Sequence, residues 1–457
     1  MDDADPPKST SDSTRTMVGV LVAMVIVLIV AGIGIATIRD ANETIRRATA
    51  PTTVATPDGA GSVPPAGDLS PEQSRVVEDV KAQVAAIRGL SWKGPLPVKV
   101  LTRDQLSTRV RQLTATEVAE NRADVDTDAS ILKLLQLIDR DVDFVKTIDS
   151  ILASGVLGYY DDETKELFVG GGSSDGLDAV TQVTLAHELT HALTDQHFDF
   201  GSRTKALDEP DQTEQAAALG ALIEGDAELV ADLWQERHLT ERQRREAATS
   251  ASDGGSAYAD APPYLLESLL FPYQDGLSFV RSLHRAGGFA EVDKAYRNPP
   301  TSTEHILHPD TYTGGQGWTA PKLPDLATAT GCGSVGRGTL GEFDMGQLLA
   351  REISRTDARK AADGWNGDAY AVVRCGAALG LADRWQTDDP TDAGPLADAL
   401  TRWARGWSGS SRAADAQGRV TGPKGSARVV RTGGRVDLVL ADDVATADRV
   451  ASALLAG

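Results

Sequence analysis

The sequence predicts an α+β fold that is predominantly helical and is preceded by a single transmembrane helix. The first observation is an uncharged apolar run near the N-terminus, long enough for a membrane helix of roughly 20 residues. The second is a series of long segments whose apolar residues recur at helical spacing. The third is a set of short alternating segments, which predict a small edge β-sheet and hairpins near the C-terminus.

The composition of the chain limits its partners. The 457 residues are 41% hydrophobic, which allows a sizeable core, and Lys and Arg number 45 against 66 Asp and Glu. The net charge of −21 argues against nucleic acid as a partner, because phosphate binding needs a basic face. The sequence leaves the oligomeric state undecided.

The N-terminal region is predicted to anchor the protein in the cell membrane. Residues 17–38 carry no charge and follow a short tail, residues 1–16. A cleaved signal peptide is the alternative, but its apolar region would be shorter, about 7–15 residues. The flanking Lys and Arg residues do not decide the orientation. A short tail before a large domain favours a single-pass protein with its C-terminal domain outside the cytoplasm.

A Pro-, Ala- and Thr-rich linker, residues 39–69, separates this span from the folded part, residues 70–457. We expect the linker to be disordered. The folded part should hold a core over residues 130–320 and a C-terminal subdomain over residues 325–457. Two cysteines occur, and they form one disulfide if the domain lies outside the cytoplasm or remain buried free thiols otherwise. They are Cys332 and Cys375.

The folded part begins with a helix start in the sequence Ser70-Pro71-Glu72-Gln73. Ser is a favoured N-cap, Pro suits the first turn, and Gln completes a capping box. The other elements follow from apolar spacing and turn residues. In order, we expect a helix over 71–88, a strand over 96–102, helices over 103–121 and 129–152, a hairpin over 156–169, long helices over 177–197 and 211–237, a loop over 246–261, a helix over 264–296, hairpins over 369–387 and 427–440, and a final helix.

The helix predicted over 177–197 carries AHELTHAL, which contains His187, Glu188 and His191. Residues four apart lie on one helix face about 5–6 Å apart, so both imidazoles can bind one metal ion. Glu188 can then reach a water molecule on that ion, as in the HExxH motif. The alternative is a helix with two ordinary histidines. A metal is favoured because the helix is otherwise apolar and buried polar groups need partners.

A catalytic zinc ion usually has three protein ligands, and the helix predicted over 211–237 offers carboxylates for the third. Either Glu224 binds the metal and Glu228 supports a histidine, or Glu228 binds it and Asp232 takes the supporting position. A solvated acidic face is the remaining alternative, and the intervening Ala, Leu, Ile and Val residues make it less favourable. The candidate carboxylates are Glu214, Glu224, Asp226, Glu228 and Asp232.

AHELTHAL and the later IEGDAEL together resemble the gluzincin zinc metallopeptidases, whose third ligand is a Glu on a downstream helix. Many gluzincins present it as Glu-Gly-x-Ala, which the sequence at 224–227 matches. The resemblance therefore implies Zn²⁺ bound by His187, His191 and Glu224. The alternative, with Glu228 as the ligand and Asp232 behind it, resembles the Glu-x-x-x-Asp arrangement of thermolysin-like enzymes. Over 130–375 the chain is also similar to uncharacterised, membrane-anchored bacterial and archaeal surface proteins with the same core.

The resemblance extends to other parts of the site. GYYDDETKELFV, residues 158–169, is similar to the edge strand that lines the gluzincin cleft and pairs with substrate, although a structural hairpin is the alternative. Gluzincins also use a downstream His or Tyr to stabilise the oxyanion, so His308, His305 and Tyr312 are candidates. A structural turn is the alternative for them. A capping box at 301–304 predicts a short helix that ends at the next proline.

These observations predict a membrane-anchored, extracytoplasmic, zinc-dependent peptidase that acts on a peptide or protein substrate. Zinc would polarise the scissile carbonyl and acidify its bound water, and Glu188 would take the proton as general base. One alternative is a non-catalytic surface protein that binds zinc or peptide on a retained peptidase fold. Another is hydrolysis of a non-peptide amide. Glu188 favours catalysis, because a structural zinc site does not require it.

Overall fold

The computed structural model describes residues 69–171, 176–207, 212–252 and 261–456. The predicted tail, the predicted membrane span 17–38 and nearly all of the predicted linker lie outside the described residues. Within the described ranges, no helix combines the length and the apolar character needed to cross a membrane.

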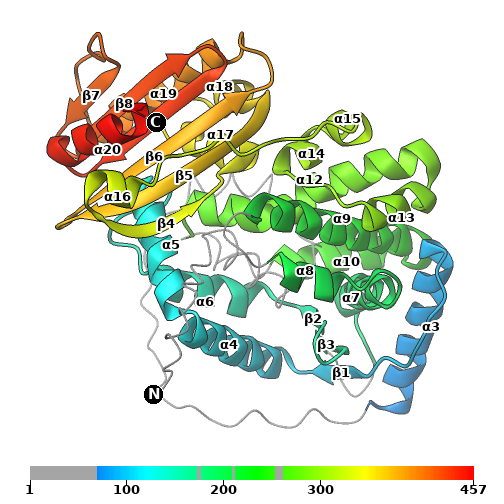
Figure 1. Cartoon of the computed structure of the whole chain (residues 1–457). Helices are drawn as coiled ribbons and strands as arrows, with labels where there is room; N and C mark the ends of the chain where they lie inside the picture. Colours follow the sequence, from blue (N-terminus) through cyan, green and yellow to red (C-terminus); the bar gives the residue numbers. More distant parts are fainter. Residues whose placement is uncertain (1–68, 172–175, 208–211, 253–260, 457) are drawn as a thin grey trace, which may run out of the picture.

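Figure 1 shows two regions, a helical one in blue to yellow-green and a C-terminal one in yellow to red that is built on a larger sheet. The helical region contains α3 (Pro71–Arg88), β1 (Val98–Leu101), α4 (Arg103–Glu120), α5 (Arg122–Leu134), α6 (Phe144–Gly155), β2 (Gly158–Asp161), β3 (Glu166–Gly170), α7 (Ala179–Phe198), α8 (Phe200–Ala206), α9 (Thr213–His238), α10 (Glu241–Ser252), α12 (Pro263–Gly287), α13 (Phe289–Arg297), α14 (Thr303–Leu307) and α15 (Pro309–Thr313). The C-terminal region contains α16 (Leu326–Thr330), β4 (Gly333–Gly338), α17 (Gly341–Ala350), α18 (Arg355–Ala362), β5 (Trp365–Cys375), β6 (Ala378–Thr387), α19 (Ala393–Ser408), β7 (Arg419–Gly422), β8 (Gly425–Thr432), β9 (Arg435–Ala441) and α20 (Val444–Ala456).

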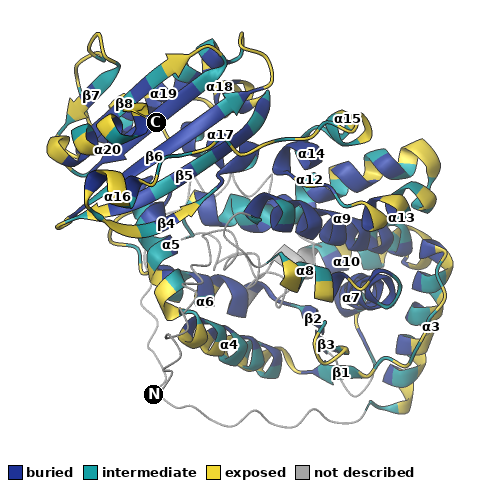
Figure 2. Ribbon diagram, in the orientation of Figure 1, coloured by how far each residue is buried: buried dark blue, intermediate teal, exposed yellow. Residues whose placement is uncertain are grey.

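Helix α9 lies at the centre of the helical region and packs against both α7 and α12. Every residue from Ala216 to Ala231 is buried, and Figure 2 shows the helix dark blue along most of its length. Its approach to α12 depends on two glycines. A Cβ on Gly225 would lie 2.2 Å from the carbonyl oxygen of Gly276, and one on Gly276 would lie 2.2 Å from that of Ala221. The two helix backbones are therefore in direct contact.

The smaller sheet has the strand order β1-β3-β2. Strand β1 runs parallel to β3, whereas β2 pairs with β3 as the predicted hairpin, with Gly158 opposite Val169. Strand β2 is therefore an edge strand of this sheet. Helix α7 contacts both β2 and β3, which places that edge beside the helix that carries the HExxH motif.

The larger sheet is antiparallel and has the strand order β4-β5-β6-β9-β8-β7. Neighbouring residues of one strand face opposite sides of a sheet, and the two sides are covered by different helices. Leu438 packs in a core with Leu396 and Trp403 of α19, whereas Val439 packs with Val450 of α20. The sheet thus lies between α19 on one face and α20 on the other.

The fold class predicted from the sequence is wrong. The described chain is a mixture of helix and sheet instead of a predominantly helical fold with a small edge sheet, because a six-stranded sheet forms the centre of the C-terminal region. The predicted transmembrane helix, residues 17–38, lies outside the described residues, and no helix within them could cross a membrane. The two C-terminal hairpins were expected as separate elements. They join instead through β6 and β9, from Gly380 opposite Ala441 to Gln386 opposite Arg435, and β4 and β7 extend the sheet on either side.

One hydrophobic core connects the two regions. It combines residues of α4, α5 and α6 with the inner face of the larger sheet and with α19. Trp407 at the end of α19 is fully buried, and its indole N–H donates to the carbonyl oxygen of Leu134, 2.8 Å away. The helical region therefore packs continuously onto the C-terminal region.

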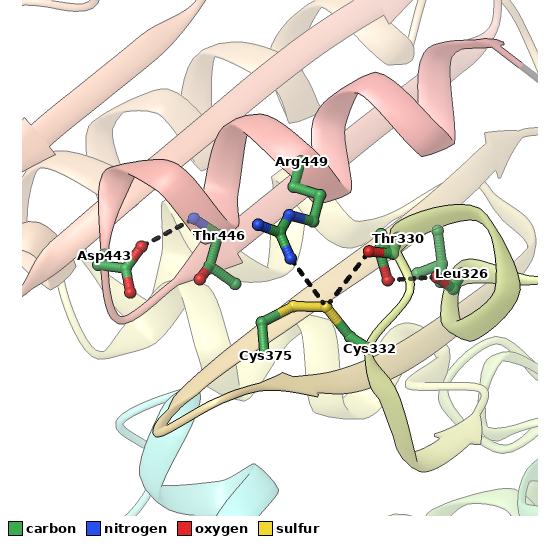
Figure 3. The surroundings of a disulfide bond; sticks show 7 residues. All are labelled: Leu326, Thr330, Cys332, Cys375, Asp443, Thr446 and Arg449. Carbon is green, nitrogen blue, oxygen red and sulfur yellow. Dashed lines mark hydrogen bonds between the residues drawn. A yellow bond between two sulfur atoms is a disulfide. The ribbon is translucent and has the colours of Figure 1, made fainter.

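Cys332 and Cys375 form a disulfide, which confirms that alternative of the two considered from the sequence. Their Cα atoms lie 4.9 Å apart, and the bond links the segment before β4 to the end of β5. Figure 3 shows Arg449 of α20 pointing toward the sulfur of Cys332, which its guanidinium reaches at 3.7 Å. The disulfide thus lies between the sheet edge and α20.

Most predicted elements occur near their expected bounds, with four differences. The helix expected over 129–152 is divided between α5 and α6, and Gln136 in the connection has a φ of 54°. The helix expected over 264–296 is divided between α12 and α13 at Gly288, whose φ is 70°. The loop expected over 246–261 is wrong at its start, because α10 continues to Ser252. The short helix α14 begins one residue later than predicted, because Ser302 is its N-cap and accepts a hydrogen bond from the backbone N–H of His305.

Candidate metal centre

Helix α7 holds two histidines side by side in the protein interior. The helix starts at the N-cap Asp178, whose carboxylate accepts from the backbone N–H of Thr181. His187 and His191 follow one turn apart, and each is only 1% exposed. Their Nε2 atoms lie 2.9 Å from each other. Both imidazoles therefore direct the same ring nitrogen toward one point.

Glu224 of α9 completes a group of three converging ligand atoms. Its Oε2 lies 3.3 Å from His187 Nε2 and 3.5 Å from His191 Nε2. A tetrahedral ion with bonds of about 2.0–2.1 Å requires its ligand atoms to be about 3.3 Å apart. The three separations fit that requirement, and the three residues are a group that could hold a metal ion. The structure thus brings together His187, His191 and Glu224, the ligand set of the alternative in which Glu224 is the third ligand.

Glu228, one turn further along α9, lies behind His187. Its Oε1 is 3.3 Å from His187 Nδ1, the ring nitrogen that faces away from the other two ligand atoms. A carboxylate in this position orients a ligand histidine and makes its imidazole more basic. Asp232, which the alternative register requires, instead pairs with Arg281 at the surface. The geometry favours Glu224 over Glu228 as the third ligand.

Burial and mutual attraction set the ionisation of these groups. Burial lowers the pKa of His191, as expected for an imidazole that is kept neutral. Burial acts the same way on His187, but hydrogen bonds to Glu224 and Glu228 outweigh it and raise the pKa of His187. Burial alone would raise the pKa of Glu224, and the two histidines instead lower it to about 2. Glu224 is therefore ionised at neutral pH, as a metal ligand must be.

Glu188 lies next to this group, and among the described residues its carboxylate has no side-chain hydrogen-bond partner, although the backbone of Tyr160 interacts with it and lowers its pKa. It is fully buried, and burial raises its pKa to about 8 despite the opposing charge of His187. A Cβ placed on Gly158 of β2 would lie 3.4 Å from Glu188 Cγ, so the edge strand passes directly over this side chain. A buried carboxyl group with no side-chain partner requires an explanation, and a water molecule held by a metal ion would supply one.

The edge strand carries two tyrosines, and both have structural contacts. Tyr160 is buried, and its hydroxyl donates to Asp195 of α7 at 2.8 Å. Tyr159 is also buried, and its hydroxyl accepts from the guanidinium of Arg109. These tyrosines attach β2 to its neighbours through their hydroxyl groups. Pairing of a substrate with the β2 backbone stays a prediction.

The three residues considered as oxyanion donors lie in and after α14, and their polar atoms are engaged there. His308 Nε2 lies 2.8 Å from Glu342 Oε1, in a second group of potential ligand atoms. The hydroxyl of Tyr312 donates to the backbone oxygen of Asn298. His305 contacts the backbone oxygen of Gln316 through Nε2. The structure does not place any of them in the group formed by the HExxH histidines.

Tyr273 is the residue near the centre that sequence reasoning missed. It lies on α12, is 2% exposed, and its ring stacks on that of His187 with the centroids 6.2 Å apart. It falls within residues 130–375, the range of the wider resemblance, and no motif singles it out. Its relation to His187 depends on the close crossing of α9 and α12, which no local pattern reveals.

The other two candidate carboxylates of α9, Glu214 and Asp226, have structural partners. Glu214 accepts hydrogen bonds from the backbone N–H and the hydroxyl of Thr303, which attaches α14 to α9. Asp226 forms a fully buried ion pair with Arg88 of α3 at 3.0 Å. The acids of α9 are thus divided between the metal group and the packing of its neighbours.

Comparisons with known proteins address parts of the chain. Residues 328–451, most of the C-terminal region, match a family described as "Domain of unknown function (DUF8575)". No curated protein matches the chain. One solved structure, "a putative hydrolase with a novel fold" from Chloroflexus aurantiacus, is 17% identical and has a TM-score of 0.37. The match covers 53% of this chain and 88% of that chain, and a likeness of this TM-score carries no argument about the site.

Proposed function

We propose that the protein is a hydrolase, and more narrowly a zinc-dependent peptidase whose ligands are His187, His191 and Glu224. One observation supports the proposal above all: three ligand atoms at separations of 2.9 to 3.5 Å lie beside a fully buried carboxyl group. Two imidazoles and one carboxylate are a common ligand set of catalytic zinc, which keeps one position free. The resemblance to gluzincins is consistent with this arrangement.

Each residue of the site has a distinct task in this proposal. A bound zinc ion would supply Lewis-acid activation of a water molecule and of the scissile carbonyl. Glu188 accepts the proton of the attacking water and delivers it to the leaving amine. Glu228 holds His187 in the orientation that directs its Nε2 to the centre. The burial of all four side chains excludes bulk water and strengthens these interactions.

The features of the chain favour a catalytic centre over a structural one. Structural zinc sites are commonly closed by cysteines, and both cysteines of this chain are joined in the disulfide. A structural site also has no use for Glu188. The disulfide supports a location outside the cytoplasm, because such bonds persist in oxidising compartments.

The proposal is tested by two variants of the full chain. Glu188→Gln should keep its zinc and lose cleavage of an unfolded protein such as casein by at least about 100-fold, the scale of general-base catalysis. His187→Ala should lose both zinc and cleavage. Zinc is measured by mass spectrometry of the metal, and cleavage by release of labelled peptides.

A matched control is His284→Gln, a histidine of α12 outside the metal group, which should keep both properties. Cleavage by Glu188→Gln at the parental rate would show that Glu188 is not the base. Zinc bound by a parent that cleaves no peptide would favour the alternative reading, a protein that binds zinc or peptide on this fold.

A further inference from the structure

A second group of ligand atoms lies outside the HExxH centre, where α14, α17 and the turn after α18 meet. His308 Nε2 is 2.8 Å from Glu342 Oε1 and 3.7 Å from Asp363 Oδ1. One ligand atom from each residue lies within 4.8 Å of the others. The three residues line a cavity of about 450 Å³ that Phe271 and Gln274 of α12 also line. Three separate segments of the chain therefore converge on this point.

Glu342 is the buried member of the group. Its side chain is 5% exposed, and its second oxygen, Oε2, is buried without a hydrogen-bond partner. A buried carboxylate oxygen normally has a hydrogen-bond partner or a ligand, so the unpaired Oε2 points to a ligand at this position. His308 and Asp363 are more exposed, at 38% and 63%, which leaves the site accessible from the cavity.

The charges around this group favour a cation. Glu304, which is buried in α14, interacts electrostatically with His308 and with the three acids Glu342, Asp363 and Asp388. The cavity also has a basic side on α18, formed by Arg355, Arg359 and Lys360, of which Arg355 is paired with Glu267, 2.7 Å away. Within the group of ligand atoms itself, two carboxylates accompany one imidazole, and this composition favours a cation there.

We propose that His308, Glu342 and Asp363 bind a second divalent transition-metal ion, with zinc as its simplest occupant. An imidazole nitrogen with two carboxylates suits zinc and its neighbours, whereas calcium and magnesium prefer oxygen alone. Ligand atoms around such an ion lie about 3.3 Å apart, and the observed separations of 2.8 and 3.7 Å lie on either side of this value. Water completes the coordination at the exposed side.

The position of this ion would give it a structural effect. It would join α14 to α17 and to the turn that leads into β5, and α14 is itself attached to α9 through Thr303 and Glu214. The ion would therefore connect the helical region with the C-terminal region. It does not require the peptidase activity proposed for the first centre.

The test counts zinc ions in the purified full chain by mass spectrometry of the metal, after equilibration with buffered free zinc. The parent should hold two, and both His308→Gln and His187→Ala should hold one. The double variant should hold none. His284→Gln is the matched control, with the same substitution outside both groups, and should hold two.

The second site is supported if His308→Gln holds less zinc than the parent while His187→Ala still holds zinc. This result supports the second site even if the first centre binds no zinc. A parent whose zinc content is unchanged by His308→Gln overturns the proposal. Because substitution of the buried Glu342 could disturb folding, the exposed Asp363→Asn serves as the second variant. It should weaken zinc binding at this site at least about tenfold, and an unchanged affinity would also count against the site.

Discussion

Gly158 allows strand β2 to lie directly against α7 at the position of Glu188. A Cβ at this residue would lie 2.8 Å from Thr184 Cγ2, 3.0 Å from the carbonyl oxygen of Phe168 and 3.4 Å from Glu188 Cγ. Two of these neighbours belong to the helix that carries the HExxH motif. The absence of a side chain at one residue thus helps to fix the position of the proposed general base.

Gly158→Ala should therefore move the strand and the helix apart. We expect a loss of about 1–3 kcal/mol in the free energy of unfolding, as for other overpacked sites, and a fall in kcat/KM for peptide cleavage. Urea unfolding and the cleavage assay measure the two effects. Gly94→Ala is the control, because nothing lies within 4 Å of its added Cβ. A Gly158→Ala protein as stable and as active as the parent would contradict the proposed contact.

Residue patterns predicted part of the candidate site. His187, Glu188 and His191 follow from helical spacing alone, and the convergence of Glu224 follows from its match to a known motif. Tyr273 and Glu342 could not be predicted, because their positions depend on how distant helices cross. The roles suggested for His308 and Tyr312 came from resemblance, and the structure places both residues with other partners.

At the scale of elements, the close contact of α9 with α12 supports the whole centre. Gly225 follows Glu224 directly, and its missing side chain makes room for the backbone of Gly276. The glycine of the Glu-Gly-x-Ala sequence thus has a packing role here, beside the metal-binding role proposed for Glu224. The same crossing places the ring of Tyr273 on that of His187.

Gly225→Ala should separate these helices, and Gly220→Ala in the same helix should not. The first variant is expected to lose about 1–3 kcal/mol or more in stability and most of its zinc affinity, because Glu224 would move. The second adds its Cβ where nothing lies within 4 Å and should gain about 0.5–1 kcal/mol from helix propensity. Thermal unfolding with and without zinc separates the two cases. Equal stabilities would show that the crossing tolerates a side chain.

The elements themselves were predicted better than their assembly. The start of α3 is local information, since Ser70 and Gln73 form the predicted capping box in the structure. Both C-terminal hairpins could also be predicted from neighbouring residues. The pairing of β6 with β9 across α19 could not, because short-range patterns do not show which distant strands pair. The division of the helix expected over 129–152 likewise depends on tertiary packing.

At the scale of the whole molecule, buried acids lie where the helical region meets the C-terminal region. Asp344 of α17 accepts a hydrogen bond from the hydroxyl of Tyr264 of α12, 3.1 Å away. Burial raises the pKa of Asp344 to about 7, although the bond to Tyr264 opposes the shift and the charge of Asp368 adds to it. The interface therefore favours the protonated form of this carboxyl group.

This shift predicts a pH dependence of stability. The folded pKa lies above the unfolded value, so the folded chain binds the proton more tightly and loses stability as pH rises from about 4 to about 7. Asp344→Asn should remove that loss. Between about pH 4 and pH 8, the free energy of unfolding of Asp344→Asn minus that of the parent should therefore increase. The increase should be on the order of a few kcal/mol at most, as expected for such a pKa shift.

Urea unfolding across this pH range measures the difference. Asp398→Asn, at an exposed position of α19, is the control and should follow the parent. A difference between Asp344→Asn and the parent that does not change with pH would show that Asp344 is ionised in the folded protein throughout.

The disulfide has a consequence for the fate of the chain when it is cut. It closes a loop with a sequence separation of 43 residues, which contains both Glu342 and Asp363. If a protease nicked the backbone anywhere inside the loop, the two fragments would remain one covalent molecule until the bond was reduced. Such a nick would be invisible on a non-reducing gel and would appear as two bands on a reducing one.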